Sequence, residues 1–374
     1  MSTRLPLSVQ LVGLLAAGHS GVPRYAEQLI RALDAIAPAT PDIAYTLLTT
    51  PAAGADLALE NIGLATPRLL RRRIRGLSNR VLLEQLTTTS SRADVLYFFD
   101  LMGPLLAPRK RFVATVHDAT AGRRLTDTRW AYKRLAHPWA VRRAQAIVAV
   151  SNFSRREAID VYGAPEDRVF VVPSGPGLHG GNAPAQGEDE TARRGFLYVG
   201  NFGRNKNVQL LIRAYERSNA QGPLILVGRS GDARADVEAL AAASARTNGI
   251  ELRDRVDDDE LEQLYATSTA FLFPSLYEGF GFPPLEAMGR GCPVVASDIP
   301  ALRETLGDAA LFLPTEEPGP WARALERLEE DGAVRADLRS RGLANVQRFS
   351  WAETARGVTD VLRGLRERAW PDGD

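Results

Sequence analysis

Apolar and polar positions along this chain follow one repeating order: a short apolar run, a loop of small or polar residues, then a segment with helical spacing. The first example is the apolar run 7–12, a loop that ends at Gly21 and the amphipathic stretch 22–33. The order returns with the run 196–199, the loop 200–207 and the helical stretch that follows. Buried strands that alternate with amphipathic helices predict parallel α/β domains, which bind their ligands where the strands end.

The remaining elements follow from the same periodicities. In the first half we expect strands at 43–49, 94–98, 111–117, 146–150 and 169–172, and helices over 130–144 and after the N-cap residue Ser151. In the second half we expect strands at 224–227, 270–274, 293–297 and 310–313, with helices over 260–267, from 284 and onward to about 349. The predicted organisation is a first domain over 1–175, a linker rich in Gly, Pro and acidic residues over 176–194, a second domain over 195–350 and a terminal helix within 351–374.

Composition fits a globular protein of two ordinary domains. Of the 374 residues, 45% are hydrophobic and 24% charged, and the net charge of +1 gives no reason to expect nucleic acid as a partner. The single cysteine, Cys292, leaves no intrachain disulfide possible and fits a reducing compartment. No apolar run reaches membrane-spanning length and no secretory signal pattern is evident, so we expect a cytoplasmic protein. The four histidines lie far apart in sequence, which predicts no metal site.

The stretch 277–297, YEGFGFPPLEAMGRGCPVVAS, concentrates the candidate chemistry. Its two glycines, Gly279 and Gly281, permit a tight turn and close approach of a ligand to the backbone. Pro284 suits the first turn of a helix, and helix N-terminal amides beside a glycine turn form an anion site, most often for phosphate. Glu278 on the loop and Glu286 on the first helical turn would accept hydrogen bonds from hydroxyls. Phosphate donors flanked by hydroxyl acceptors predict a nucleotide-sugar site; the alternative is a turn with two solvated glutamates.

This stretch resembles the paired-glutamate motif of retaining GT-B glycosyltransferases, specifically glycosyltransferase family four. The resemblance rests on Glu278 and Glu286 with seven residues between them, and on the pattern E-G-F-G-x-P-x-L-E-A-M around them. It implies two Rossmann-like doubly wound domains facing one another across a cleft, with the C-terminal helix crossing back to the N-terminal domain. The implied activity is transfer of a hexose from a GDP- or UDP-linked donor to a hydroxyl with retained anomeric configuration, without a metal or other cofactor.

The resemblance also implies which cations hold the donor phosphates. Lys206 matches the family's phosphate-binding lysine, and Arg204 would be the second cation. Relatives usually carry that arginine at the positions of Asn201 or Asn205, so its place is shifted here.

Further roles are implied for the glutamates and for several backbone positions. Glu286 would bind the ribose, and Glu278 the hydroxyls of the transferred sugar. Backbone that would approach the donor or its base lies at Gly21, Gly200, Gly228, Val256, Gly279, Phe280 and Gly281.

On the first domain, His117 and Asp118 end a predicted strand and resemble the family's element near the donor sugar. The alternative is a core histidine beside a capping aspartate. Arg24 and Tyr25, which follow Gly21, resemble the family's N-terminal segment near the diphosphate; the alternative for Arg24 is a solvated helix residue.

The acceptor is open: a glycan, a lipid-linked molecule or a small molecule. The segment that begins at Arg68 and ends at Arg75 is strongly basic with apolar residues interleaved, which predicts either docking on anionic lipid or a solvated arginine-rich helix. The particular residues of the glutamate motif, E-G-F-G-F-P-P-L-E at 278–286, suggest a mannosyl donor. A nucleotide-sugar epimerase of the same fold and an inactive nucleotide-sugar-binding protein are the alternative functions, and the sequence predicts no oligomeric state.

Overall fold

The protein is described from a computed structural model that covers residues 5–12, 21–49, 56–65, 88–101, 103–104, 106, 109–119, 130–176 and 193–367. It divides into two compact units. The first contains the described residues up to Gly175 together with those from Phe349 onward, and the second runs from Pro176 to Arg348. Most of the predicted linker, and the basic segment from Arg68 to Arg75, lie outside the described residues.

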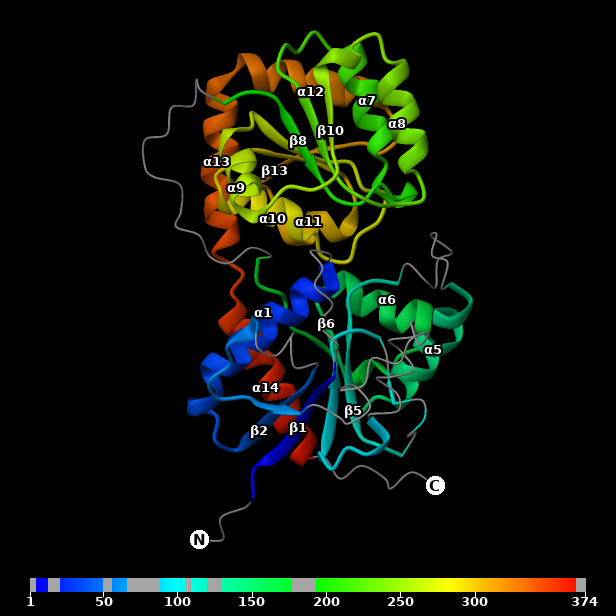
Figure 1. The fold of residues 1–374 in the computed structure, drawn as a ribbon, viewed down its shortest axis with the longest axis vertical. Helices are drawn as coiled ribbons and strands as arrows, with labels where there is room; N and C mark the ends of the chain where they lie inside the picture. Colours follow the sequence, from blue (N-terminus) through cyan, green and yellow to red (C-terminus); the bar gives the residue numbers. More distant parts are fainter. Residues whose placement is uncertain are drawn as a thin grey trace. The chain divides into compact units, whose positions relative to one another are not determined.

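The first unit is built on a seven-stranded parallel sheet with the order β3-β2-β1-β4-β5-β6-β7. Its strands are β1 (Leu7–Val12), β2 (Ile43–Leu48), β3 (Gly63–Ala65), β4 (Val95–Phe98), β5 (Phe112–Val116), β6 (Ala146–Ala149) and β7 (Val169–Val171). Its helices are α1 (Gly21–Ile36), α5 (Trp130–Arg143), α6 (Asn152–Tyr162) and α14 (Trp351–Glu367). Figure 1 shows α1 and α14 on one side of the strands and α5 and α6 on the other.

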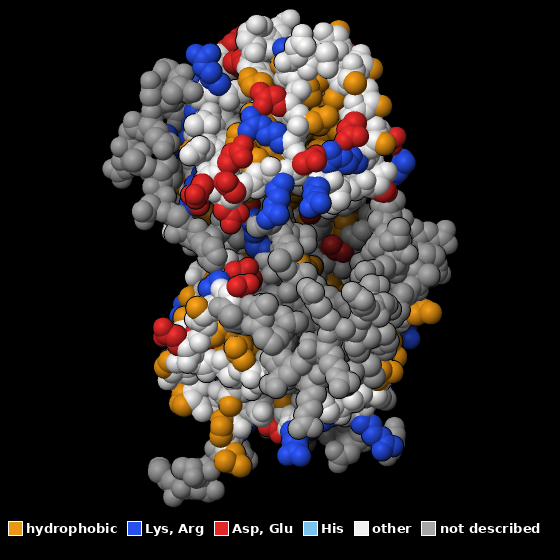
Figure 2. Space-filling view, in the orientation of Figure 1, with side chains coloured by type: hydrophobic (Ala, Val, Ile, Leu, Met, Phe, Trp, Pro, Cys, Tyr) orange, Lys and Arg blue, Asp and Glu red, His pale blue; other side chains and the backbone are white. Residues whose placement is uncertain are grey.

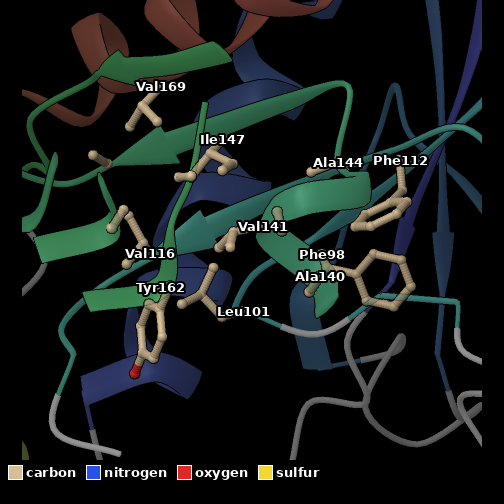
Figure 3. Close-up of a cluster of buried hydrophobic side chains, with 14 of the residues drawn as sticks. Phe98, Leu101, Phe112, Val116, Ala140, Val141, Ala144, Ile147, Tyr162 and Val169 are labelled. Carbon is tan, nitrogen blue, oxygen red and sulfur yellow. The ribbon is translucent and has the colours of Figure 1, made fainter. Parts of the chain in front are cut away.

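Strands covered by helices on both faces need apolar side chains on both faces, which explains their continuous apolar runs. One side of the first sheet packs against α5 and α6 in the cluster drawn in Figure 3. The rings of Phe98 and Phe112 meet edge to face at 5.9 Å, and Phe112 stacks on Trp139 with ring centroids 6.1 Å apart. Val141 of α5 and Ile147 of β6 belong to the same cluster and are fully buried.

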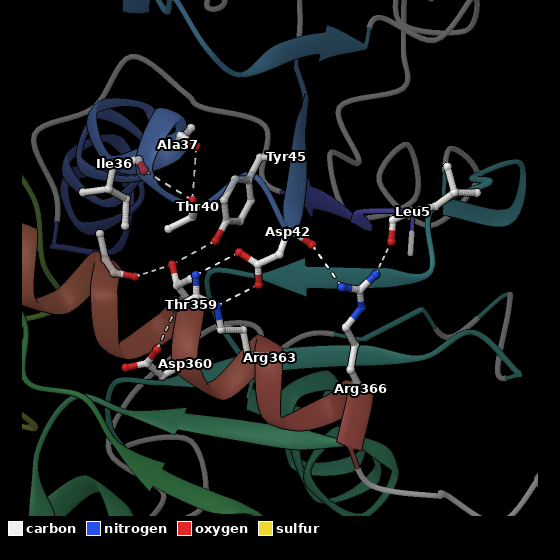
Figure 4. A network of polar contacts seen from close by, with 11 residues as sticks. Leu5, Ile36, Ala37, Thr40, Asp42, Tyr45, Thr359, Asp360, Arg363 and Arg366 are labelled. Carbon is white, nitrogen blue, oxygen red and sulfur yellow. Dashed lines mark hydrogen bonds and ion pairs between the residues drawn. The ribbon is translucent and has the colours of Figure 1, made fainter. Parts of the chain in front are cut away.

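Helix α14 returns the chain to the first unit, where it packs against α1. Its buried residues Val358 and Leu362 follow helical spacing. Figure 4 shows the polar contacts beside this apolar stripe: the Thr359 hydroxyl lies 2.9 Å from the Tyr45 hydroxyl, and Arg363 donates to both carboxylate oxygens of Asp42 at 2.8 and 2.9 Å. The predicted crossing of the terminal helix onto the first domain is confirmed.

The second unit has a six-stranded parallel sheet with the order β10-β9-β8-β11-β12-β13. Its strands are β8 (Phe196–Val199), β9 (Leu224–Val227), β10 (Ile250–Arg253), β11 (Ala270–Phe273), β12 (Val294–Ser297) and β13 (Ala310–Leu313). Its helices are α7 (Val208–Arg217), α8 (Arg234–Ala243), α9 (Asp258–Thr267), α10 (Phe282–Gly289), α11 (Pro300–Leu306), α12 (Pro318–Glu330) and α13 (Gly332–Val346). In both units the first and fourth strands are neighbours, which is the doubly wound order with a switch point between them.

The predicted α/β class is therefore confirmed, with differences at particular elements. Strand β10 ends at Arg253, so Val256 lies in the loop before the N-cap residue Asp257. Helix α8 was not predicted, because its alanine-rich sequence has little contrast between apolar and polar faces. Strand β3 was missed as well; it is a three-residue strand at the edge of its sheet. Among the described helices, none combines the length and the hydropathy that crossing a membrane requires.

Candidate functional site

Two loops of the second unit meet at its switch point. The loop after β8 contains a short 3-10 turn, Arg204–Lys206, and the loop after β11 contains Glu278. The backbone N–H of Leu276 donates to the carbonyl of Asn205 at 2.8 Å, which ties the two loops together. Doubly wound sheets bind their ligands in the crevice outside the strand ends at this point.

Lys206 and Glu278 form an ion pair between these loops. The ammonium of Lys206 donates to Oε1 of Glu278, and the two side chains are only 17% and 13% exposed. The same ammonium lies 5.6 Å from the centre of the Phe273 ring. Water therefore screens this pair less than it would a surface pair. The predicted cation and the predicted sugar-binding carboxylate thus lie in direct contact.

Asn207 fixes the start of α7 directly after Lys206. Its backbone has a φ of +54°, the left-handed region that only glycine and, to a lesser degree, asparagine and aspartate adopt readily. Its side-chain amide donates to the carbonyl of Thr315 at 2.8 Å, and its own carbonyl accepts the N–H of Leu210 at 3.0 Å. Asparagine at position 207 therefore tolerates the left-handed backbone conformation that directly follows Lys206.

The structure does not bring Arg204 to the Lys206–Glu278 pair. Its side chain is 63% exposed and lies 3.7 Å from Asp232 and 3.6 Å from Asp236. Its backbone N–H also donates to Asp232 at 2.9 Å. On the face of the second unit drawn in Figure 2, Lys and Arg side chains are similarly interspersed with Asp and Glu. Contact of Arg204 with phosphate stays a prediction.

Gly200 and Gly228 lie against one another in the turns that follow β8 and β9. A Cβ atom on Gly228 would come within 2.1 Å of the Gly200 carbonyl oxygen, a separation that no folded chain tolerates. The N–H of Gly200 donates to Val227, and that of Gly228 donates to Arg253. Glycine at 228 is thus required by the packing of the two turns, whatever ligand approaches them.

Arg234 joins the turns at the ends of three neighbouring strands. Its guanidinium donates to the carbonyls of Gly228 and Arg229 at 3.0 and 2.7 Å, and forms an ion pair with Asp254, which follows β10, at 2.6 Å. It also lies 5.8 Å from the centre of the Phe202 ring, in the loop after β8. Arg234 lies outside the motifs that the sequence shows, so the sequence analysis did not predict its role. Val256, two residues after Asp254, is half-buried.

The expected start of a helix at Pro284 is corrected by the glycine loop and α10. Gly281 adopts a φ of +94°, and a Cβ there would lie 2.7 Å from the Leu302 side chain. This conformation lets α10 begin at Phe282, two residues before the predicted start. Pro283 and Pro284 then occupy its first turn and have no N–H to donate. Pro283 and Pro284 therefore supply no amide donor to an anion, which removes the helix start at Pro284 from the predicted anion site.

Glu286 is consequently the fifth residue of α10 and lies on its second turn, not its first. Its side chain is nearly inaccessible, with the residue 4% exposed. The Tyr265 hydroxyl, from α9, donates to Glu286 Oε2 at 3.1 Å. The alternative of a solvated glutamate does not hold for Glu286, which is buried beside Tyr265 of α9. Tyr265 gave no signal in the sequence beyond its place in a predicted helix.

In the first unit, His117 follows β5 and its Nε2 lies 2.7 Å from the carbonyl oxygen of Phe99. A carbonyl can only accept, so Nε2 carries the proton and Nδ1 is the acceptor of the neutral ring. Burial lowers the pKa of His117 below its ordinary value of 6.5, although the bond to Phe99 and the charge of Asp118 act the other way. The Tyr25 ring meets the imidazole edge to face at 4.7 Å.

Two other predicted residues of the first unit, Asp118 and Gly21, differ in their exposure. Asp118 is half-buried directly after His117, and Gly21 is exposed at the first position of α1. A Cβ on Gly21 would meet nothing within 4 Å, so local packing does not demand glycine there. In the part of the chain that the structure describes, no three His, Cys, Asp or Glu side chains are grouped so that they could hold a metal ion.

Comparison with known proteins supplies the family. Residues 19–176 match the family model for Glycosyltransferase Family 4, and residues 183–344 match the model for Glycosyl transferases group 1. Together the two models cover most of both units.

Curated relatives match more than half of the chain. The O-antigen chain mannosyltransferase B of Escherichia coli is 34% identical over 223 residues, which are 56% of this chain and 58% of that protein. The D-inositol 3-phosphate glycosyltransferase of Kineococcus radiotolerans is 32% identical over 262 residues, which are 61% of this chain and 59% of the relative. The chain thus spans less than two thirds of the length of each of these two relatives.

Solved structures establish the architecture. HepE of Anabaena in complex with UDP-glucose matches with a TM-score of 0.74 at 18% identity, covering 96% of this chain and 100% of that one. Sucrose-phosphate synthase of Thermosynechococcus elongatus matches with a TM-score of 0.73 at 20% identity, covering 96% and 99% of the two chains. These matches identify the fold as GT-B. Together with the two family models, the doubly wound units and the glutamate motif place the chain in glycosyltransferase family 4.

Proposed function

We propose that this protein transfers a hexose from a nucleoside diphosphate sugar to a hydroxyl of a glycan, a lipid-linked molecule or a small molecule, with retained anomeric configuration. The observation that supports this most directly is the pairing of Lys206 with Glu278 where the loops after β8 and β11 meet. A cation and a carboxylate side by side suit a ligand that joins a diphosphate to a polyhydroxylated ring.

The proposed chemistry is electrostatic. As the bond between the sugar and the diphosphate breaks, negative charge grows on the leaving diphosphate, and Lys206 is placed to stabilise it. The Glu278 carboxylate, released from Lys206 by the incoming phosphate, can accept from sugar hydroxyls and favour positive charge at the anomeric carbon. We propose that these groups, with the amides of the glycine loop, make a divalent cation unnecessary. Same-face substitution and a covalent intermediate are both compatible with this arrangement.

The first test is a thermal-shift panel of nucleotide sugars. A donor that binds only the folded state raises its stability by mass action, by on the order of 3 kcal/mol at a hundredfold excess over Kd. We expect a GDP- or UDP-linked hexose to raise Tm and the free sugars not to do so. The mannosyltransferase names of several relatives put GDP-mannose first in the panel, and the UDP-glucose complex of HepE puts UDP-glucose second.

The second test follows the reaction by NMR with the donor so found, an acceptor panel and EDTA. We expect a product with the donor's anomeric configuration. Conversion of the donor sugar into its epimer without acceptor would favour the epimerase alternative, and tight donor binding with no turnover on any acceptor would favour the inactive binder. Turnover lost in EDTA and restored by Mg²⁺ or Mn²⁺ would contradict the metal-independent proposal.

The basic segment from Arg68 to Arg75 supports a separate proposal, contact with anionic lipid and hence a lipid-linked acceptor. Flotation with neutral and acidic liposomes at physiological salt tests it, since charges farther apart than about 8 Å are screened there. Equal recovery with both liposome types would favour the solvated-helix interpretation.

A further inference from the structure

We propose that Asp232, in the turn between β9 and α8, is a positioning residue for Lys206. Its carboxylate holds the 3-10 turn Arg204–Lys206 in the shape that places the Lys206 ammonium where the diphosphate of the donor binds. The inference rests on the proposed function, because it takes a nucleoside diphosphate as the ligand of Lys206. It assigns a role to a residue that lies outside the motifs of the sequence.

The contact that carries the proposal caps the 3-10 turn. The first N–H groups of a short helical turn have no partner within it. Gly203, which precedes this turn, has no side chain that could accept from them. Instead, Asp232 Oδ1 accepts the N–H of Arg204, the first residue of the turn, at 2.9 Å. At the other end, the N–H of Lys206 donates to the Gly203 carbonyl at 2.9 Å and closes the turn. Asp232 therefore fixes the beginning of a three-residue turn that ends at Lys206.

Asp232 belongs to a turn that is itself fixed against the loop after β8. The N–H of Phe202 donates to the Ser230 carbonyl at 2.6 Å, and the N–H of Ala233 donates to the Phe202 carbonyl at 2.9 Å. Gly231 has a φ of +145°, and a Cβ there would lie 2.1 Å from the carbonyl carbon of Phe202. The backbone on both sides of Asp232 is thus bound to that loop, so its carboxylate starts from a fixed place relative to the 3-10 turn.

The same contacts indicate that Arg204 serves the site through its backbone. Its exposed guanidinium lies 3.7 Å from Asp232 and 3.6 Å from Asp236, and ion pairs of this kind contribute little because water screens them. Its N–H is tied by a directed hydrogen bond, and a bond to a charged group is stronger than one between neutral groups. Among the described residues, the Asp236 carboxylate contacts only the guanidinium.

Charge and geometry make opposite predictions for the two aspartates. A carboxylate near a phosphate site repels an anionic ligand, so its removal should leave binding unchanged or tighten it. Loss of a group that orders the turn acts the other way. If the turn keeps its shape only about a tenth of the time, the apparent Kd of the ligand rises about tenfold. Positioning by Asp232 therefore predicts weaker binding when its acceptor is removed.

The test measures Kd by calorimetry for GDP and UDP and follows whichever binds the wild type more tightly. We expect Asp232→Ala to raise this Kd by about tenfold. Asp232→Asn removes the charge but keeps an oxygen that can accept from Arg204, so it should stay within about threefold of the wild type. The matched control is Asp236→Ala, which removes the same charge without a bond to the backbone and should not raise the Kd. Thermal melts check that all three variants fold.

Amide hydrogen exchange tests the contact without any ligand. The Arg204 N–H should exchange faster in Asp232→Ala than in Asp236→Ala, because only the first variant opens its hydrogen bond. Equal exchange in these two variants would overturn the inference.

A double-mutant cycle shows whether Asp232 acts through Lys206. In the Lys206→Ala background, Asp232→Ala should change the Kd little further, because the group that the turn positions is gone. The inference would be overturned, with the proposed function left standing, if Asp232→Ala left the Kd unchanged, if Asp232→Asn or Asp236→Ala raised it equally, or if the full effect persisted without Lys206. Wild-type protein that binds neither nucleotide would overturn the proposed function and this inference with it.

Discussion

Lys206 donates to Glu278 across the two loops that flank the switch point of the second sheet, so the cation of the candidate site is already neutralised by its carboxylate. A phosphate that binds Lys206 must compete with Glu278. Donor binding and release of Glu278 are thereby coupled in the proposed reaction.

Removing the charge of Glu278 should affect binding and turnover in opposite directions. Glu278→Gln frees Lys206 from its partner, so we expect the nucleoside diphosphate to bind about tenfold more tightly, a difference of about 1.4 kcal/mol. Turnover should fall, because the amide cannot favour positive charge at the anomeric carbon. Calorimetry and steady-state kinetics measure the two effects. Weaker binding of the diphosphate in this variant would contradict the coupling.

Glu286→Gln should act differently. Ribose contacts persist from ground state to transition state, so their loss mainly raises the donor KM and changes kcat less. The amide oxygen can still accept from Tyr265, so the melting temperature should change little. Kinetics on this variant and on Glu278→Gln, with thermal melts as controls, decide between the roles. A kcat effect confined to Glu286→Gln would reverse the assignment.

Lys206→Ala should lower turnover more than Arg204→Ala does. Loss of a charge-assisted contact to phosphate costs about 1.5–3 kcal/mol, or roughly one to two decades in rate. Arg204 is exposed and already paired with Asp232 and Asp236, where an ion pair contributes about 1 kcal/mol at most. Steady-state rates at saturating donor are the measurement. Equal losses in the two variants would mean that Arg204 turns toward the phosphate during the reaction.

Asn207 provides a test of backbone geometry. Both variants lose the bond to Thr315. Asn207→Ala also puts alanine, which adopts a positive φ poorly, in the left-handed region, whereas glycine adopts this conformation readily. We expect the alanine variant to be less stable than the glycine variant by about 1 kcal/mol. Denaturant unfolding gives the two free energies. Equal stabilities would show that the positive φ is not what selects the residue here.

His117 should make stability fall as the solution becomes more acidic. Burial lowers its pKa in the folded state, so below its ordinary value of 6.5 the unfolded chain binds a proton that the folded chain does not. Its contribution is therefore present above about pH 6.5 and declines as the pH drops toward the lowered pKa. The free energy of unfolding at pH 7.5 and 5.5 should differ more in the wild type than in His117→Gln. An equal difference in both would assign the slope to other groups.

The sequence predicted elements well where burial dictated composition. Central strands covered on both faces need apolar side chains on both, so runs such as 270–273 and 294–296 are continuously apolar and stand out. Helix α7 was predictable because one of its faces is buried and the other solvated. The places of Lys206 and Glu278 were predictable from the same pattern, because the loops that bind ligands in this class of fold follow directly after the strands.

What the sequence could not supply were contacts between distant residues and single backbone angles. The bond from Tyr265 to Glu286 and the ties from Arg234 to three loops depend on helix packing, which leaves no periodic signal. The early start of α10 depends on the left-handed turn at Gly281, and it moved Glu286 from the first helical turn to a covered position on the second.

Helix α14 completes the first unit, yet a ribosome makes it only after the whole second unit. At about 5–20 residues per second, synthesis of the segment 176–348 delays it by on the order of ten to thirty seconds. Through that interval the surface that will receive Val358 and Leu362 has no covering helix of its own, and Tyr45 has no Thr359 hydroxyl to meet. The first unit must therefore wait until the second unit has been synthesised before it can close, and a nascent chain stalled within the second unit would expose that apolar surface to chaperones and proteases.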